Sequence, residues 1–299
     1  MTADSTNTAP LDSDAVAAAR RRGMVLTLLG TALLSTSDAL SKTLTETYPV
    51  GELIFLRGLC VLIPVLLIVR AQGGIASLRV ADWRAQLVRG TLFVMSGVFF
   101  VTSLSLLPLP LVTTVSFVAP IFTTLLAIPL LGERVSWPVW VAVFAGFGGV
   151  VVTLDPSGAP WSWAALLPVL GALAASLRDI LTRRLSARET SGAIMFYSMA
   201  LMVACASLSA PFGWRWPDPL DLLLFLAVGF LVGGAHTLMI EGIRLCEVSL
   251  IAPLKYVMIL YSIGYGALIW HDLPSLQALL GTVIIVASGV FIVRRQARA

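Results

Sequence analysis

The sequence predicts an all-α integral membrane protein, with ten transmembrane helices arranged as two inverted five-helix repeats around a central cavity. Three observations predict this fold: the composition, ten apolar segments of spanning length, and a match between the two halves. Of the 299 residues, 58% are hydrophobic and 12% are charged, and the mean hydropathy is +0.93. Soluble domains carry about 25% charged residues. The composition therefore excludes an ordinary soluble enzyme, a disordered chain and a nucleic-acid-binding protein.

Each predicted helix is a mostly apolar segment close to the roughly 20 residues that a bilayer crossing needs. In chain order, these segments are residues 24–43, 50–70, 85–106, 110–131, 137–154, 162–182, 191–211, 219–243, 248–270 and 275–293. Turn-forming residues separate neighbouring segments at 47–49, 107–110, 132–134, 155–158, 216–219 and 271–274. Because none of these connections is long enough to fold as a soluble domain, we expect the function to reside within the membrane.

Two of these segments contain an internal proline. Pro120 and Pro253 lie inside the fourth and ninth segments, where a proline interrupts the helix and frees the carbonyl one turn earlier. Those carbonyls belong to Ser116 and Ser249. Such breaks are tolerated in a membrane where they face a cavity or a neighbouring helix.

The chain divides into a tail and two repeats. Residues 1–23 are predicted to be a disordered cytoplasmic tail, because residues 1–19 are mostly small, polar or acidic and the arginine triplet at 20–22 adjoins the first helix. Residues 24–154 form the first five-helix repeat, and residues 155–299 form the second repeat with a short C-terminus.

Basic residues accumulate on one side of this arrangement. Three arginines precede the first helix, and after ten crossings the C-terminal arginines return to the same side. Connections on that side also hold Arg70, Arg79, Arg84, Arg134, Arg183, Arg184, Arg188 and Arg244. The opposite side holds only Arg215, with Lys42 at a helix end. The positive-inside rule then places both termini on the cytoplasmic side of the membrane. We expect this membrane to be the inner membrane of a bacterium.

The two halves of the chain match each other. Matched pairs are Asp38 with Asp179, Lys42 with Arg183, Phe55 with Phe196, Gly90 with Gly229, and Phe117 with Tyr256. Since each half has five helices, the second half starts on the opposite side of the membrane, and the repeat is inverted. Inverted repeats are typical of transporters, whose substrate sites lie near the middle of the bilayer.

With these features the chain resembles the drug/metabolite transporter superfamily, in particular its EamA-type ten-helix members. The resemblance is carried by the two halves, Pro120, the Gly132-Glu133-Arg134 sequence and the small residues at 146–149. Within the superfamily the chain is most similar to the YddG-type amino-acid exporters. The resemblance implies a monomer in which helices 1, 3, 4, 6, 8 and 9 line a central cavity, with helices 5 and 10 at the periphery.

Ionisable residues within spanning helices are costly and therefore mark candidate functional positions. Together with the two aromatics beside the proline breaks, the candidates for the substrate cavity are Asp38, Arg57, Phe117, Asp179, His236, Lys255 and Tyr256. Arg178 and Glu241 also lie within the inner half. Arg89 and Arg244 lie near the predicted interfaces, so we assign them to snorkelling rather than to the cavity.

The partners of these charges remain open from sequence alone. Asp38 has Lys42 four residues later and Arg57 on the next helix, while Asp179 has Arg183 four residues later. Lys255 has Asp179, Glu241 or a substrate carboxylate as a partner. His236 is either a core histidine or a proton relay.

Small residues predict close helix contacts. Pairs of small residues four positions apart are Ala142 with Gly146, Ala145 with Gly149, and Gly229 with Gly233. No phosphate-binding loop, nucleophile elbow or metal-spaced Cys/His cluster occurs in the sequence. We therefore expect no cofactor, metal or nucleic-acid partner, and no enzymatic activity.

The leading interpretation is a secondary transporter that exports amino acids or related small metabolites by alternating access. Its partners are then the small-molecule substrate and membrane lipid. A zwitterion needs an anionic group, a cationic group and room for a side chain, which the candidate residues supply. Efflux of lipophilic cationic drugs is one alternative, although it favours an unpaired carboxylate and few bases. An intramembrane enzyme is the other.

Overall fold

The computed structural model describes residues 13–131, 137–154, 163–185, 188–245 and 252–296, and all regular secondary structure in these ranges is helical. The first half contains α1 (Ser13–Thr45), α2 (Val50–Ala71), the 3-10 turn η1 (Gly74–Leu78), α3 (Trp83–Leu106), α4 (Leu109–Ser116), α5 (Ala119–Leu131) and α6 (Trp137–Leu154). The second contains η2 (Trp163–Ala165), α7 (Leu166–Leu185), α8 (Ser191–Ser207), α9 (Pro219–Leu245), η3 (Ala252–Tyr256), α11 (Val257–Tyr265), η4 (Gly266–Trp270) and α12 (Leu276–Gln296).

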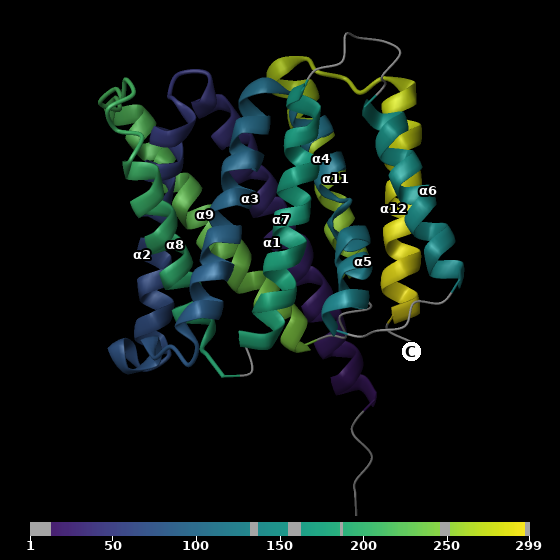
Figure 1. Ribbon diagram of the computed structural model, residues 1–299, viewed down its shortest axis with the longest axis horizontal. Helices are drawn as coiled ribbons and strands as arrows, with labels where there is room; N and C mark the ends of the chain where they lie inside the picture. Colours follow the sequence, from purple (N-terminus) through teal and green to yellow (C-terminus); the bar gives the residue numbers. More distant parts are fainter. Residues whose placement is uncertain (1–12, 132–136, 155–162, 186–187, 246–251, 297–299) are drawn as a thin grey trace, which may run out of the picture.

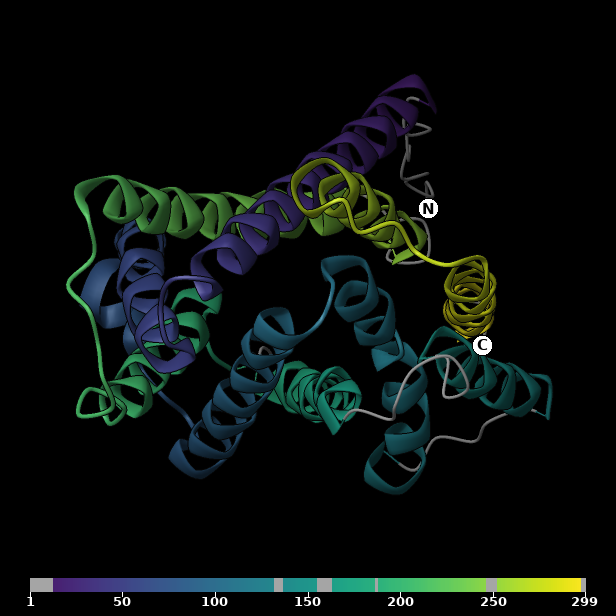
Figure 2. The same ribbon diagram turned by 90° about the horizontal axis from the view of Figure 1, so that it is seen from above.

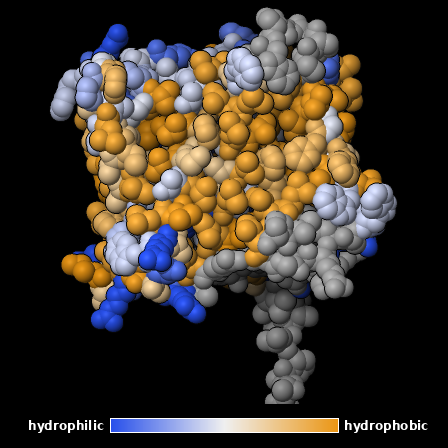
Figure 3. Space-filling model, in the orientation of Figure 1, coloured by the Kyte–Doolittle hydropathy of each residue, from blue (hydrophilic) through white to orange (hydrophobic). Residues whose placement is uncertain are grey.

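The apolar helices agree with the predicted membrane fold. Among the described residues, six helical stretches are long and apolar enough to cross a membrane: Ala17–Thr45, Val50–Ala71, Trp83–Leu106, Trp137–Leu154, Trp163–Thr182 and Pro219–Met239. Four shorter apolar stretches are Leu109–Thr123, Ser191–Ser207, Leu254–Trp270 and Leu276–Ile292. These ten stretches coincide with the ten predicted spans. The face drawn in Figure 3 has an apolar belt between two more hydrophilic ends. The prediction of an all-α membrane protein is confirmed.

The first helix is longer than predicted. α1 begins at Ser13, so the described part of the predicted tail, residues 13–23, is helical and the boundary at residue 24 was wrong. Four alanines at positions 15 and 17–19 explain the extension, because alanine has the highest helix propensity. Three features used in the sequence analysis lie outside the described residues: the Gly132-Glu133-Arg134 sequence, the 155–158 connection and Ser249.

The fourth predicted span is broken, and the ninth is broken at a matched place. α4 ends at Ser116 and α5 begins at Ala119, so Pro120 is the second residue of a new helix. At the break, the amide of Phe117 donates to the carbonyl of Thr114 at 3.1 Å, in a tighter 3-10 turn. In the second half, η3 gives way to α11 between Tyr256 and Val257. The prolines thus interrupt both repeats beside the matched aromatics.

The packing of the helices follows an inverted repeat. α1 packs on α9, and α3 packs on α7, so the first helix of each half contacts the third helix of the other. α2 packs on α8, α4 on α11 and α6 on α12, which pairs matched helices across the molecule. Seen from above, the helices surround the centre, and the α6–α12 pair stands at one side (Figure 2).

The predicted small-residue contacts are present. A side chain at Gly149 of α6 would approach the carbonyl oxygen of Gly281 of α12 to 3.0 Å. A side chain at Gly229 of α9 would lie 2.8 Å from the carbonyl oxygen of Cys60 of α2. Contacts this short are rare or absent for real Cβ atoms, so glycine allows these helix backbones to approach one another.

The described ends of the chain lie at the same face of the molecule. α1 begins and α12 ends at the bottom of Figure 1, which we call the terminus face. The face at the top of Figure 1, where α1 ends and α2 begins, is called the distal face. An even number of membrane crossings returns the chain to the face where it started.

Candidate functional site

A cavity of about 490 Å³ lies among the helices. Its described lining comes from α1, α2, α3, α7, α8 and α9, with Ser116 at the α4 break and Met258 of α11. The volume is in the range of small-molecule sites, about 300–1,000 Å³. No described residue of α6 or α12 lines it, in agreement with the peripheral place expected for helices 5 and 10. The lining also includes α2 and α8, which the resemblance did not imply.

Much of the cavity wall is apolar. Large apolar side chains in the lining include Phe93, Phe100, Met195, Met199, Met202 and Met258. Methionine is unbranched and polarisable, so a methionine-rich wall adapts to ligands of different shape.

One charged pair lies toward the distal face. Arg57 Nη2 of α2 is 3.9 Å from Asp38 Oδ1 of α1, and both side chains are largely buried. Arg57 Nη1 also donates to the hydroxyl of Ser41 at 3.2 Å. Of the two partners that the sequence left open for Asp38, the structure gives Arg57, and both residues line the cavity.

Lys42 instead closes the bundle at the distal face. Its ammonium donates to the carbonyl oxygens of Leu104 at 3.1 Å and Leu107 at 2.9 Å, at the end of α3. It also lies over the ring of Trp270, 5.3 Å from the centroid. A buried cluster that includes Ala39, Leu104 and Leu109 lies beside these contacts. The contacts of Lys42 join α1, α3 and the end of η4, on the distal side of the Asp38–Arg57 pair.

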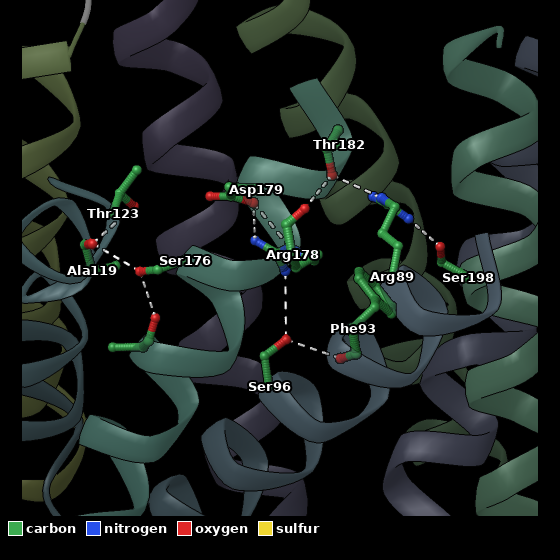
Figure 4. Close-up of polar contacts among 11 residues, drawn as sticks. Arg89, Phe93, Ser96, Ala119, Thr123, Ser176, Arg178, Asp179, Thr182 and Ser198 are labelled. Carbon is green, nitrogen blue, oxygen red and sulfur yellow. Dashed lines mark hydrogen bonds and ion pairs between the residues drawn. The ribbon is translucent and has the colours of Figure 1, made fainter. Parts of the chain in front are cut away.

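A second charged pair lies toward the terminus face. Arg178 donates from Nε and Nη2 to Oδ1 of Asp179, at 3.0 and 2.8 Å (Figure 4). The Arg178 guanidinium also lies 5.7 Å from the centroid of the Phe93 ring. The Asp179 side chain is 57% exposed although it lies within the bundle, because it faces the cavity. The predicted partner Arg183 has its side chain outside the described part of the chain.

Arg89 is a cavity residue that the sequence analysis missed. It is 7% exposed, and its Nε donates to the hydroxyl of Thr182 of α7 at 2.8 Å. Its Nη1 donates to the hydroxyl of Ser198 and, at 3.3 Å, to the carbonyl of Ile194, both on α8. Figure 4 shows Arg89 turned toward Thr182 and Ser198. The prediction that Arg89 snorkels to the interface was wrong, because α7 and α8 hold its guanidinium inside the bundle.

A capping signal shows why Arg89 lies deeper than expected. Asp82 accepts hydrogen bonds from the amides of Arg84 at 3.0 Å and Ala85 at 3.1 Å, so α3 begins at Trp83. An aspartate at this position is a common N-cap. Recognition of that cap would have placed Arg89 nearly two turns into the helix, beyond the first turn.

His236 lines the cavity from α9. Its Nδ1 lies 2.9 Å from the carbonyl oxygen of Val232, four residues earlier. A carbonyl only accepts hydrogen bonds, so Nδ1 carries the proton and Nε2 of the neutral ring is an acceptor. The predicted role as a proton relay remains a prediction.

The other three candidates lie outside the described lining of the cavity. The rings of Phe117, just after α4, and Tyr256, at the end of η3, pack on each other with centroids 4.8 Å apart. Tyr256 also packs against Gly289 of α12. Lys255 is half-buried, and Asp179 is the acidic group whose charge acts on it. The matched aromatics therefore pack where the two repeats meet, and Lys255 adds to the charges around Asp179.

Metal binding finds no support in the described ranges, where no three His, Cys, Asp or Glu side chains come together as a metal site requires. The polar groups of the described lining are instead charged and hydroxyl side chains on six different helices, with His236 on a seventh. This arrangement suits reversible binding of a polar organic molecule.

Comparison with known proteins places both halves of the chain in one family. The model of the EamA-like transporter family matches residues 21–155 and 162–294. A solved crystal structure superposes with a TM-score of 0.66 at 20% identity, covering 92% of this chain and 97% of that chain.

Several similar proteins have names that state a cargo. An S-adenosylmethionine uptake transporter of Rickettsia conorii is 29% identical over 71% of this chain and 72% of its own length. A pseudopaline exporter of Pseudomonas aeruginosa is 26% identical over 92% and 96% of the two chains. A riboflavin transporter of Rhizobium johnstonii is 28% identical over 75% of each.

Proposed function

Because the chain belongs to the EamA-like transporter family, we propose that it is a secondary transporter for amino acids or related zwitterionic metabolites. The observation that carries the substrate class is the lining of the cavity, in which charges of both signs face an apolar wall. We further propose export, by alternating access, across the cytoplasmic membrane of a bacterium.

The cavity offers each part of a zwitterion a matching group. Asp179 presents a half-exposed carboxylate to an ammonium group, and arginines face a carboxylate. Phe93, Phe100 and the methionines accept the rest of the molecule. The volume of about 490 Å³ accommodates an amino acid with a large side chain or a bulkier derivative.

Efflux of lipophilic cations fits this lining less well. A cation carrier is expected to present an unpaired carboxylate and few bases. Here both lining carboxylates have an arginine partner, and three arginines line the described cavity: Arg57, Arg89 and Arg178. Positive charge at the wall repels a cationic cargo that has no carboxylate of its own to pair with it.

The relatives supply a second candidate within the same substrate class. Some are named for uptake of S-adenosylmethionine, which is itself an amino-acid derivative, and others for pseudopaline export or for riboflavin. Both directions occur among these names, so direction needs a direct measurement. S-adenosylmethionine therefore belongs in the test panel beside the common amino acids.

Reconstitution into liposomes tests the function. Purified protein is given radiolabelled amino acids, S-adenosylmethionine, riboflavin and tetraphenylphosphonium, without ATP and with or without a pH gradient. We expect saturable flux of at least one zwitterion, recovered chemically unchanged, and no flux in protein-free liposomes. Flux of tetraphenylphosphonium alone would favour drug efflux, and a chemically altered product would favour an enzyme. An absolute requirement for ATP would reject a secondary transporter.

A further inference from the structure

The guanidinium of Arg89 is fixed in place by neutral groups. Nε donates to the hydroxyl of Thr182 of α7 at 2.8 Å. Nη1 donates to the carbonyl of Ile194 and to the hydroxyl of Ser198, both on α8. Within the described residues, no carboxylate lies within ion-pair distance of it. Arginine stays charged in proteins, so this buried cation is oriented by its neighbours and is not neutralised by them in direct contact.

One end of the same guanidinium is left to the cavity. Nη2 has no hydrogen-bond partner among the described residues, while Nε and Nη1 are both bonded. The fully buried side-chain atoms that lack a hydrogen-bond partner do not include Nη2. Nη2 is therefore accessible, and Arg89 lines the cavity. A charged donor held in a fixed orientation at a cavity wall suits an anionic acceptor, because charge-assisted hydrogen bonds are the strong ones.

The charges around Arg89 leave an excess of cations. Arg178 acts electrostatically on Arg89, and Asp179 is already bonded to Arg178. Lys255 adds a third cation near Asp179. Glu189 also acts on Arg89, but it does not line the described cavity, and its Oε1 accepts from the amide of Ala81 at 3.0 Å. Among the described residues linked by these interactions, Arg89 and Lys255 included, three cations stand against two carboxylates, which leaves room for the negative charge of a ligand.

The repeat does not account for this arginine. The alignment that matches Phe55 with Phe196 places Arg57 opposite Ser198. In the first half, Arg57 pairs with Asp38 on the neighbouring helix. In the second half, the matched position is a serine, and the guanidinium beside it comes from α3 of the other repeat. A buried charge without a symmetry-related role is a functional-site hypothesis.

We infer that Arg89 binds the carboxylate of the substrate through Nη2, at the end of the cavity toward the terminus face. This inference rests on the proposed function, and it names the group of the substrate that is recognised there. The ligand class is an organic carboxylate such as an α-amino acid. Its body then extends along Phe93 and Phe100, which line the cavity from the same helix.

Paired acids and amides test this assignment. Phenylalanine, methionine, leucine and alanine are each compared with their carboxamides, which keep the ammonium group and side chain but lack the carboxylate. Binding to the purified protein is titrated through the shift in its unfolding temperature, which does not require transport. Flux of the same pairs is measured in liposomes. For wild type we expect at least one acid to bind about tenfold or more tightly than its amide.

The Arg89→Gln variant is expected to lose that preference. Binding of the acid should weaken by about tenfold to a hundredfold, while binding of the amide stays within about twofold. Arg89→Lys keeps the positive charge but lacks the planar set of guanidinium donors, so it should retain part of the preference for the acid. It replaces Arg89→Gln in the test if that variant fails to fold. Arg84→Gln is the matched control, because Arg84 lies on the same helix with an exposed side chain. It should bind both ligands as wild type does.

Several outcomes would overturn the assignment. A wild-type protein that binds no acid more tightly than its amide has no carboxylate site. Equal losses for acid and amide in Arg89→Gln and Arg89→Lys would mean that Arg89 only supports the fold. Flux of riboflavin alone, without acid preference, would keep the transporter and remove the carboxylate site. An acid preference lost in Arg89→Gln without any flux would keep the site and remove the proposed transport.

Discussion

The two repeats share a helical scaffold and differ in how their charges are paired. In the first repeat, Asp38 and Arg57 face each other across α1 and α2 at 3.9 Å. In the second, the matched Asp179 is bonded at 2.8 Å to Arg178 on its own helix. The matched partner of Arg57 is Ser198, which accepts from Arg89. A symmetric scaffold has thus produced a cavity with two unlike ends.

The difference teaches which pair is available to a ligand. The Asp38 side chain is 8% exposed, and its pairing joins two helices. The Asp179 side chain is 57% exposed to the cavity, and its partner Arg178 is on the same helix. We therefore expect the first pair to matter more for stability and the second pair to matter more for substrate binding.

Membrane topology tests the inversion itself and has an all-or-none outcome. Reporter fusions after Arg298 and in the 155–161 connection should report opposite sides of the membrane. The arginine distribution predicts the fusion after Arg298 to be cytoplasmic. Two fusions on the same side would contradict the ten-helix inverted arrangement.

Lys255 carries a charge where the first repeat has Ser116. Lys255→Met keeps the length of the side chain and removes the charge that acts near Asp179. We expect a folded protein whose flux falls by about tenfold or more, as for loss of a charged hydrogen-bonding group. Ser116→Ala, the matched change in the first repeat, should reduce flux by a smaller factor. Wild-type affinity and rate in Lys255→Met would show that the charge has a structural role.

The two matched aspartates should differ in their effect on stability. Asp38→Asn leaves Arg57 largely buried without its carboxylate, and we expect the free energy of unfolding to fall by about 2 kcal/mol. Asp179→Asn leaves Arg178 at the cavity wall and should cost about 1 kcal/mol or less. Denaturation in detergent measures both, and Asp38→Asn combined with Arg57→Gln should recover part of the loss. Equal losses for the two single variants would contradict the comparison.

The smallest expected effect concerns the matched aromatics. The Tyr256 hydroxyl is buried without a hydrogen-bond partner among the described residues, and its counterpart Phe117 has no hydroxyl. Tyr256→Phe makes the two halves alike and removes an unsatisfied polar group. The protein should be unchanged or stabilised by up to about 1 kcal/mol in thermal unfolding. A clear loss of stability would mean that the hydroxyl is satisfied in the membrane.

The fold was largely predictable because spanning length and hydrophobicity dominate helix formation in a membrane. α2 and α6 begin where predicted and end within a residue of the prediction. The break between α4 and α5 was assigned to Pro120, but the two helices were predicted as one span, because hydropathy alone does not register a break in a helix. The start of α1 was missed, because charge was given more weight than the helix propensity of its alanines.

The candidate site was predictable only in part. Asp38, Arg57, Asp179 and His236 line the cavity, as intramembrane charge suggested. The partner of Asp179 was not predicted, because neighbouring residues on a helix do not normally face each other. Arg89 was missed, since its depth depends on the cap at Asp82 and on the position of α8, and the latter is a tertiary property.

The methionines of the cavity wall have an evolutionary consequence. Met195, Met199, Met202 and Met258 form a surface that adapts to cargo shape without a change of backbone. Selection for a new nutrient or toxin can then act on a few charged positions while the adaptable wall is inherited intact. A lineage that duplicates such a gene gains a permissive starting point, from which a new cargo is reached through a few substitutions.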